Sequence, residues 1–284
     1  MKAERSGMLK SDRHKALVGD ILGIFFAIFI FIIPFAFMLV NSMKDRKEAN
    51  LLSIALPESF QWGNFVEAFS AQNYQILTAF KNSLLLTAGS VIGLIIVGAM
   101  AGYVIQRRQD KLMTGISRLI MVGLMVPAAI LPTIWLLQAL HIYRTLFSMI
   151  LIEMALQIPF TVMLYRGFMS SIPKELEEAG YIDGCTSPQI FTKIVLPLLK
   201  PVTATVVVLN ACTVFNDFTN PLYFLPGSEN VTVQLTLYNF MGQYSSSYNL
   251  LFADVIIITI PMLIIFIIFN RQLVEGMTAG AVKG

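Results

Sequence analysis

The sequence predicts an all-α integral membrane protein with six transmembrane helices and with both the N and the C terminus in the cytoplasm. Three observations support this prediction: the composition, the length of the apolar segments and the distribution of basic residues. The chain is 56% hydrophobic and 13% charged, whereas charged residues make up about 25% of a typical soluble domain. Because backbone groups in lipid must be hydrogen-bonded internally, long apolar segments indicate helices rather than the shorter, alternating strands of a barrel.

Six segments have about the 20 apolar residues that a helix needs to cross the hydrocarbon core of a bilayer. They are Val18–Val40, Ser83–Ile105, Ile116–Leu140, Leu146–Phe168, Val202–Leu222 and Leu251–Phe269. The first segment follows five basic residues, as the apolar core of a signal peptide would. It is longer than the usual signal core of roughly 7–15 residues, and no small-residue cleavage site follows it. We therefore expect it to be a retained first span.

The basic residues orient the chain across the membrane. Six crossings from an inner N terminus place fifteen of the twenty Lys and Arg residues on the inner side. This asymmetry satisfies the positive-inside rule. We therefore expect a cytoplasmic tail over 1–17, a six-helix domain over 18–270 and a second cytoplasmic tail over 271–284. The net charge of +3 is then a topology signal rather than a sign of nucleic-acid binding.

The first outer segment predicts a helix that lies along the membrane surface. Within Gln61–Phe69, the aromatic residues Trp62, Phe65 and Phe69 recur on one face of a helix, beside the acidic Glu67. This pattern is typical of an interfacial anchor, and contact with a partner protein is the other interpretation.

A long polar segment over 171–201 separates the fourth and fifth apolar segments and predicts two short helices joined by a turn. Gly184 suits a left-handed cap after the first helix, because glycine adopts that conformation cheaply. Thr186 and Gln189 have the spacing of a capping box at the start of the second helix. Pro197 suits the end of this second helix, ahead of the fifth span.

One face of the first short helix is built for close approach. Leu176, Ala179 and Gly180 share this face, and two of them are small, so that a partner's backbone could come near. On physical grounds alone, the segment could also be an amphipathic connector lying on the membrane.

The same segment resembles the cytoplasmic EAA loop of ABC importer permeases, whose pattern is E-A-A, then G four residues on, then I-x-L-P. The matching positions are Glu178-Ala179-Gly180, Gly184 and Ile194–Pro197, with glycine in place of the third alanine. The resemblance implies that a separate ATPase subunit is contacted by Glu178, Ala179, Gly180, Asp183 and Gly184. It also implies the partners of that family: a second homologous permease subunit, two ATPase subunits and an external solute-binding protein. The implied location is the inner membrane of a bacterial or archaeal cell.

The resemblance extends to the maltose-permease-like branch of the family. The C terminus, Gly276–Gly284, is similar to the family's G-L-T-A-G-x-V-K-G, which implies ATPase contact through Thr278, Ala279, Gly280 and Lys283. The implied function is that of the permease subunit of a carbohydrate importer, with an oligosaccharide as the expected substrate, working by alternating access. Polyols and glycerol phosphates are carried on the same scaffold and stay open as alternatives.

Polar residues in the fifth segment are candidates for the substrate path. Intramembrane polar groups tend to face protein or water, because their exposure to lipid is costly. We therefore expect the path to be lined or supported by Asn210, Asn216, Asp217 and Asn220. Hydrogen bonding between helices at the permease dimer interface is the alternative.

An uncharged outer loop, Phe240–Asn249, has the chemistry of a sugar contact. Amide and hydroxyl groups can exchange hydrogen bonds with a sugar, and tyrosines can stack on it; the candidates are Gly242, Gln243, Tyr244, Ser245 and Tyr248. In maltose-like permeases the matching loop enters the binding protein and helps to expel the sugar, and the resemblance implies that role here. A plain interfacial turn anchored by its tyrosines is the alternative.

Other functional classes fit the sequence less well. The chain has no G-x-x-x-x-G-K-[ST] phosphate loop, so ATP and Mg are expected on the partner ATPase subunits, and no cofactor on this chain. Cys185 and Cys212 do not suggest a metal site. The two histidines, His14 and His141, lie outside any H-E-x-x-H pattern, which disfavours a membrane enzyme.

An ion-coupled secondary transporter is the main alternative of another class. Such proteins place ionisable residues near the middle of the membrane. Here Glu153 and Asp217 are expected within about two turns of the outer face, and the predicted spans hold no deep Lys, Arg or His. This distribution argues against ion coupling.

Overall fold

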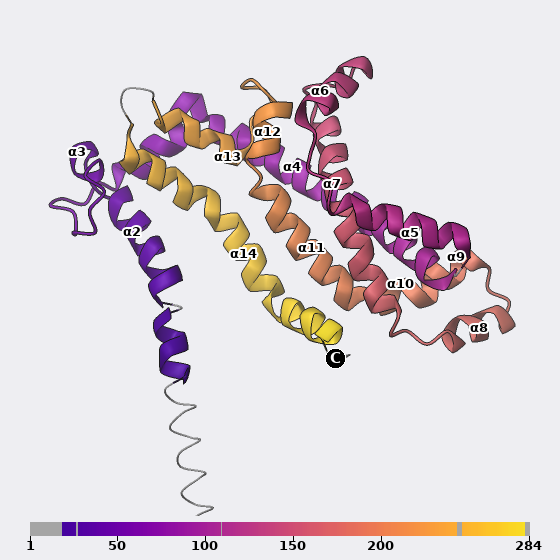
Figure 1. Ribbon diagram of the computed structural model, residues 1–284. Helices are drawn as coiled ribbons and strands as arrows, with labels where there is room; N and C mark the ends of the chain where they lie inside the picture. Colours follow the sequence, from indigo (N-terminus) through magenta and orange to yellow (C-terminus); the bar gives the residue numbers. More distant parts are fainter. Residues whose placement is uncertain (1–18, 27, 109, 243–245, 282–284) are drawn as a thin grey trace, which may run out of the picture. The chain divides into compact units, whose positions relative to one another are not determined.

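The computed structural model describes residues 19–26, 28–108, 110–242 and 246–281, with side chains described as far as Ile268. Within these ranges every regular element is helical, and extended pairing is limited to a single antiparallel bridge between Met241 and Ser246 (Figure 1). The predicted all-α class is confirmed.

The described residues form two compact units. The first comprises the described residues up to Ala71 together with Leu237–Ile257. Its elements are η1 (Ile28–Ile32), α2 (Ile33–Ser42), α3 (Arg46–Ala49), the start of α4 (Gly63–Arg107), η3 (Leu237–Phe240) and the start of α14 (Tyr248–Ala281).

The second unit comprises Gln72–Thr236 and the described residues from Ile258 onward. Besides the remainders of α4 and α14, it contains α5 (Lys111–Gly123), α6 (Ile130–Ala139), α7 (Leu146–Met169), α8 (Glu175–Ile182), α9 (Ser187–Ile190), η2 (Phe191–Val195), α10 (Leu196–Leu198), α11 (Lys200–Phe215), α12 (Thr219–Phe224) and α13 (Val233–Thr236).

Among the described residues, four helices are long and apolar enough to cross a membrane. They are Gly19–Ser42, Gly63–Arg107, Leu146–Met169 and Tyr248–Ile268. They cover the first, second, fourth and sixth predicted segments, which are therefore confirmed as helices of spanning length. The 18-residue apolar stretch of Gly19–Ser42 has no residue buried within the described part of the chain.

Asn64 ties three helices of the first unit together. Its side-chain amide donates hydrogen bonds of 2.8 Å each to the carbonyl oxygens of Ser42, the last residue of α2, and of Lys44. Its Oδ1 accepts a hydrogen bond of 3.0 Å from the amide of Asn249, in the first turn of α14. Because each of these groups is buried, the bonds fix how the end of α2 and the starts of α4 and α14 meet.

The predicted surface helix forms the beginning of α4, which starts at Gly63 rather than at Gln61. Ala68 is buried in a cluster with Phe240 and Leu250, whereas Trp62 is 63% exposed. Three successive residues, Gln72, Asn73 and Tyr74, then have positive φ of 49°, 56° and 61°. A left-handed conformation costs about 1–2 kcal/mol per non-glycine residue. The backbone of α4 is therefore strained at these three residues.

In the second unit, α4 packs closely on α7 through glycines spaced four or five residues apart, namely Gly89, Gly93, Gly98 and Gly102. A Cβ on Gly102 would lie 2.7 Å from Cβ of Tyr165 and 3.2 Å from the backbone nitrogen of Arg166. Small residues at such an interface let two helix backbones approach, which is a common way to join helices in lipid.

The third predicted span is wrong as one continuous helix. The structure has α5 and α6 in its place, separated by residues 124–129. Pro127 lies in this break, and proline has no backbone N–H to continue a helix. The apolar count along Ile116–Leu140 could not detect this interruption, because Pro127 lies between apolar neighbours.

The fifth predicted span, Val202–Leu222, differs from the observed helix at both ends. The helix α11 ends at Phe215, and α12 begins only at Thr219. At its other end α11 meets the helical run Ser187–Leu198 at a bend of 73°. If this bent pair is counted as one span, the described helices provide up to five. The third predicted segment, which forms the interrupted pair α5 and α6, is not among these five.

Candidate functional site

The polar segment over 171–201 folds as the two predicted arms. The first arm is α8, and Gly184 follows it with φ +82°, which confirms the predicted left-handed cap. The N–H of Cys185 donates to the carbonyl oxygen of Gly180 at 2.9 Å, and the N–H of Gly184 donates to that of Tyr181 at 3.1 Å. This pair of bonds is a Schellman motif, which satisfies the last carbonyls of α8 and turns the chain sharply.

The second arm begins at the predicted capping position. The N–H of Thr186 donates to Oε1 of Gln189 at 2.8 Å. The arm then continues through η2 and α10 as far as Leu198 and bends at the fully buried Leu199 into α11. Thus the segment has two helical arms, the second of which leads through this bend into α11.

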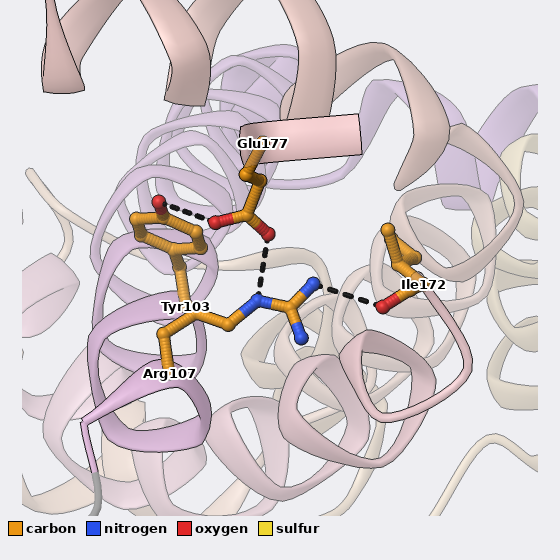
Figure 2. Close-up of polar contacts among 4 residues, drawn as sticks. All are labelled: Tyr103, Arg107, Ile172 and Glu177. Carbon is orange, nitrogen blue, oxygen red and sulfur yellow. Dashed lines mark hydrogen bonds and ion pairs between the residues drawn. The ribbon is translucent and has the colours of Figure 1, made fainter. Parts of the chain in front are cut away.

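A cluster of hydrogen bonds and an ion pair joins the first arm to the end of α4 (Figure 2). The carboxylate of Glu177 accepts hydrogen bonds from Nε of Arg107 at 2.6 Å and from the hydroxyl of Tyr103 at 2.9 Å. A second guanidinium nitrogen of Arg107 donates to the carbonyl oxygen of Ile172 at 3.0 Å. We call Tyr103, Arg107, Ile172 and Glu177 the α4–α8 clamp.

The clamp is largely shielded from water. The side chains of Arg107 and Glu177 are only 12% and 10% exposed. The ring of Tyr103 also packs on Phe191 of the second arm, with the ring centroids 5.3 Å apart. Moving α8 away from α4 would separate a largely buried ion pair and leave its charges uncompensated, which is costly. The clamp therefore stabilises the contacts among α8, η2 and α4.

The outward side of the first arm carries four of the five residues predicted to contact a partner. Glu178, Ala179, Asp183 and Gly184 are all exposed. Beside them Ile182 is 86% exposed, which is unusual for so large an apolar side chain at a helix end. This side therefore offers carboxylates and an apolar tip to a second protein.

Gly180 differs from the other members of the predicted face. It is buried, and a Cβ there would lie 2.6 Å from Cδ1 of Ile194 and 3.3 Å from Cγ1 of Ile190. Glycine at this position is therefore needed for the packing of the two arms on each other. The expected face of Leu176, Ala179 and Gly180 is split, with Leu176 and Ala179 exposed and Gly180 turned inward.

Of the predicted path residues, Asn210 is buried between α11 and α7. Its side-chain amide donates to the hydroxyl of Thr161 at 3.3 Å and to the carbonyl oxygen of Val206 at 2.9 Å. With 2% of its surface exposed, Asn210 joins two helices of the same chain. Asn216 is exposed, and its Oδ1 accepts a hydrogen bond from Gln234 at 3.2 Å.

The other two path residues form one acidic cluster at the start of α12. Asp217 accepts a hydrogen bond from the side-chain amide of Asn220 at 2.6 Å and caps the backbone N–H of Thr219 at 2.9 Å. The buried Glu153 of α7 interacts with both Asp217 and Asn220. The structure thus brings together Asp217 and Asn220, whereas Asn210 lies farther along α11.

The outer loop is closed at its base. Met241 and Ser246 form the antiparallel bridge, and the carbonyl oxygen of Ser246 accepts a hydrogen bond from Asn50 at 3.1 Å. Tyr248 stacks on Phe252, with centroids 6.3 Å apart, and is thus part of the base. Gly242 belongs to the described residues, whereas Gln243, Tyr244 and Ser245 lie outside them.

The predicted C-terminal tail continues α14. The backbone is helical through Thr278, Ala279 and Gly280 as far as Ala281. Lys283 lies outside the described residues.

Sequence reasoning missed the clamp. Tyr103 and Arg107 lie four residues apart and so share one helix face, which is a visible signal of joint contact. Glu175, Glu177 and Glu178 look alike in the sequence, however, and choosing the partner of Arg107 among them requires the fold of the second arm.

Comparisons with known proteins identify the family of the chain. Residues 94–279 match the family described as binding-protein-dependent transport system inner membrane component. The melibiose/raffinose/stachyose import permease protein MelC of Bacillus subtilis (strain 168) is 32% identical over 89% of this chain and 91% of its own length. A probable starch degradation products transport system permease protein, AmyC of Thermoanaerobacterium thermosulfurigenes, is 31% identical over 89% of this chain and 92% of its own.

Solved structures share the fold. The crystal structure of a bacterial ABC transporter involved in the import of the acidic polysaccharide alginate matches with a TM-score of 0.79 and 19% identity, over 92% of this chain and 97% of that chain. A bacterial alginate ABC transporter in complex with an alginate pentasaccharide-bound periplasmic protein matches with a TM-score of 0.68 and 18% identity, over 92% and 94%. The family match and the relatives establish what the chain is: a multi-pass membrane protein that belongs to the binding-protein-dependent transport system inner membrane components, the permeases of ABC importers.

Proposed function

We propose that this chain is one of two permease subunits in an ABC importer that takes up an oligosaccharide by alternating access. The observation that carries the proposal is the two-sided construction of α8. One side is paired with α4 through the ion pair of Glu177, and the other side exposes Glu178, Asp183 and Ile182. An element that couples an ATPase subunit to a membrane domain needs both a surface that binds the ATPase and a firm connection to a membrane helix.

The proposed topology has six spans with both termini in the cytoplasm. The interrupted pair α5 and α6 makes the third span, and α11 with α12 makes the fifth. This arrangement is supported by the excess of Lys and Arg that it places on the cytoplasmic side, together with the loop over 171–201.

In the proposed mechanism, movement of the ATPase subunits reaches the membrane helices through two connections. Two partner subunits bind and hydrolyse ATP with Mg, and their closure moves the docked α8. The α4–α8 clamp transmits that motion to α4, and the second arm transmits it to α11 through the bend at Leu199. Both helices then move together, which exchanges an inward-facing for an outward-facing state.

The proposed partners are a second homologous permease, two ATPase subunits and a solute-binding protein. Glu178, Ala179, Asp183 and Gly184 make the ATPase contact, Gly180 supports it from within the loop, and the tail joins through Thr278, Ala279, Gly280 and Lys283. The outer loop, through Gly242, Gln243, Tyr244, Ser245 and Tyr248, reaches into the docked binding protein.

Two observations support an oligosaccharide as the substrate. The relatives named above carry melibiose, raffinose, stachyose or starch products in their names. Asn216, which follows α11, and Asn220 of α12 supply neutral hydrogen-bonding groups, which suit sugar hydroxyls.

The direct experiment is uptake by the assembled importer in proteoliposomes. Labelled raffinose or a maltooligosaccharide is supplied with the solute-binding protein encoded beside the permease, with ATP enclosed. We expect uptake that requires ATP and both partner types and that persists when a protonophore dissipates ion gradients. Uptake that follows the ion gradient without ATP would establish the secondary-transporter alternative instead.

A further inference from the structure

Two adjoining cavities lie between the end of α4, α5 and the end of α7. The larger has a volume of about 680 Å³ and the smaller about 290 Å³. Five residues line both cavities, among them Gln106, Ser117 and Arg166, so the two form one continuous cleft. None of the residues proposed above for ATPase, substrate or binding-protein contact lines it.

The larger cavity is strongly basic. Three arginines line it, namely Arg108, Arg118 and Arg166, and no Asp or Glu is among its lining residues. Asp110 pairs with Arg108 at 2.8 Å, which offsets one of the three charges. The cavity therefore keeps a net charge of about +2, and a bound anion would lower its electrostatic energy.

Arg166 is already oriented by neutral partners. Its guanidinium donates to the hydroxyl of Ser117 at 2.6 Å and to Oε1 of Gln106 at 3.2 Å. These bonds hold the group in place without cancelling its charge. A guanidinium held in this way can offer its remaining N–H groups to a phosphate, for which its planar geometry is well suited.

The smaller cavity continues the cleft along apolar side chains. Its lining includes Ile120, Met121, Pro159, Val162 and Met163, all on the membrane helices α5 and α7. Met121 and Met163 are 43% and 37% exposed, so this wall stays uncovered within the chain. A free phosphate would make no use of such a wall, whereas a ligand with both an anionic group and a hydrocarbon chain would use both parts.

We propose that this cleft binds one anionic phospholipid, with its phosphate among Arg108, Arg118 and Arg166 and an acyl chain along Met121, Pro159 and Met163. Basic pockets between membrane helices on the cytoplasmic side are a known way to hold lipid head groups. The assignment to the inner leaflet rests on the topology proposed above, because Arg107 at the same end of α4 contacts the inner loop. Such a lipid would fill the cleft beside the α4–α8 clamp.

The test uses the complete importer, reconstituted in nanodiscs with equal amounts of phosphatidylglycerol and phosphatidylcholine and then extracted in mild detergent. Native mass spectrometry counts the phospholipid that stays bound. We expect the wild-type complex to retain phosphatidylglycerol in preference to phosphatidylcholine. The double variant Arg118→Gln/Arg166→Gln should lose about tenfold or more of this retention, since each lost charged hydrogen bond weakens binding substantially. Arg144→Gln, at an arginine that lies over Tyr143 away from the cleft, is the matched control.

A second variant tests the acyl part without changing charge. Gly167 lines the smaller cavity, and a Cβ there has open space, so Gly167→Phe should fill the cleft and lower retention to a similar degree. Gly115→Phe, at another glycine with open space but outside both linings, is its control and should retain the lipid. Equal retention of both phospholipids by the wild-type complex, or unchanged retention in either cleft variant, would overturn the proposal.

A photo-cross-linking residue at Ser170, which lines the smaller cavity, provides a readout that does not depend on these variants. In the otherwise unmodified importer, we expect cross-links to phospholipid. Cross-links to the second permease would show that a protein covers the cleft and would equally overturn the proposal. Displacement of phosphatidylglycerol by millimolar inorganic phosphate alone would show a simple anion site and would contradict the acyl contact.

Discussion

At the scale of single residues, neighbouring carboxylates in α8 have opposite tasks. Glu177 is turned into the protein and pairs with Arg107, whereas Glu178 is exposed on the docking side. The difference comes from the helical rotation of about 100° per residue, which sends adjacent side chains to different faces. One glutamate therefore holds α8 against α4, while the next is free of that pairing and available for the proposed ATPase contact.

The first prediction separates these tasks. Glu177→Ala removes the partner of a largely buried guanidinium and should destabilise the loop by about 3 kcal/mol. Glu178→Ala, the control one residue along, should leave stability unchanged within about 0.5 kcal/mol and weaken ATPase binding instead. Thermal unfolding of the purified permease and pull-down of the ATPase measure the two effects. Equal losses of stability in both variants would show that the clamp contributes nothing.

The second prediction concerns two asparagines of the predicted substrate path. Asn210 bonds to Thr161 between helices, so Asn210→Leu should cost about 0.5–1.5 kcal/mol of stability and leave sugar specificity as it was. Asn216 is exposed at the end of α11, so Asn216→Leu should keep stability but change the apparent affinity for the transported sugar. Competition uptake assays with several oligosaccharides provide the comparison. Altered specificity in Asn210→Leu alone would reverse this assignment.

At the scale of whole elements, the contact between α4 and α7 depends on glycine. The third prediction is that Gly102→Ala destabilises the permease by about 1–3 kcal/mol, because its added Cβ meets Tyr165 and the backbone nitrogen of Arg166. Gly115→Ala has open space and should be neutral or stabilising by up to about 1 kcal/mol. Melting temperatures in detergent measure both. If Gly102→Ala melts at or above the wild-type temperature, the two helices do not need this close approach.

The fourth prediction concerns the outer loop as an element. Met241 and Ser246 form a bridge, and Tyr248 stacks on Phe252 next to it. Deleting Gly242–Ser246 should leave docking of the binding protein largely intact but trap the sugar on it when the ATPases close. Release of labelled sugar from the docked binding protein is the measurement. If the deletion leaves sugar release unchanged, the loop only connects two elements.

At the scale of the whole molecule, the apolar pattern predicted the class and most spans. The first, second, fourth and sixth segments are confirmed as helices that are long and apolar enough to cross a membrane. The third and fifth were misjudged, since a count of apolar residues does not register Pro127 or the polar end at Asn216. Each helix interruption there depends on one or two residues among many apolar ones.

The candidate site was predicted in outline for a similar reason. The sequence predicted the turn at Gly184 and the capping interaction of Gln189, because each depends only on residues a few positions away. The inward position of Gly180 and the pairing of Glu177 with Arg107 could not be predicted, since both depend on contacts between segments distant along the chain.

The most direct test of the central claim, that α8 couples ATP hydrolysis to transport, is Gly184→Asp in the assembled importer. The added Cβ in a left-handed position costs about 1–2 kcal/mol and would re-aim the exposed turn. Gly227→Asp makes the same change at the other described glycine with positive φ, which lies away from the loop, and serves as the control. We expect Gly184→Asp to insert normally, to bind the ATPase weakly and to abolish ATP-driven uptake, while Gly227→Asp still binds the ATPase. Wild-type ATPase binding and uptake in Gly184→Asp would contradict the account.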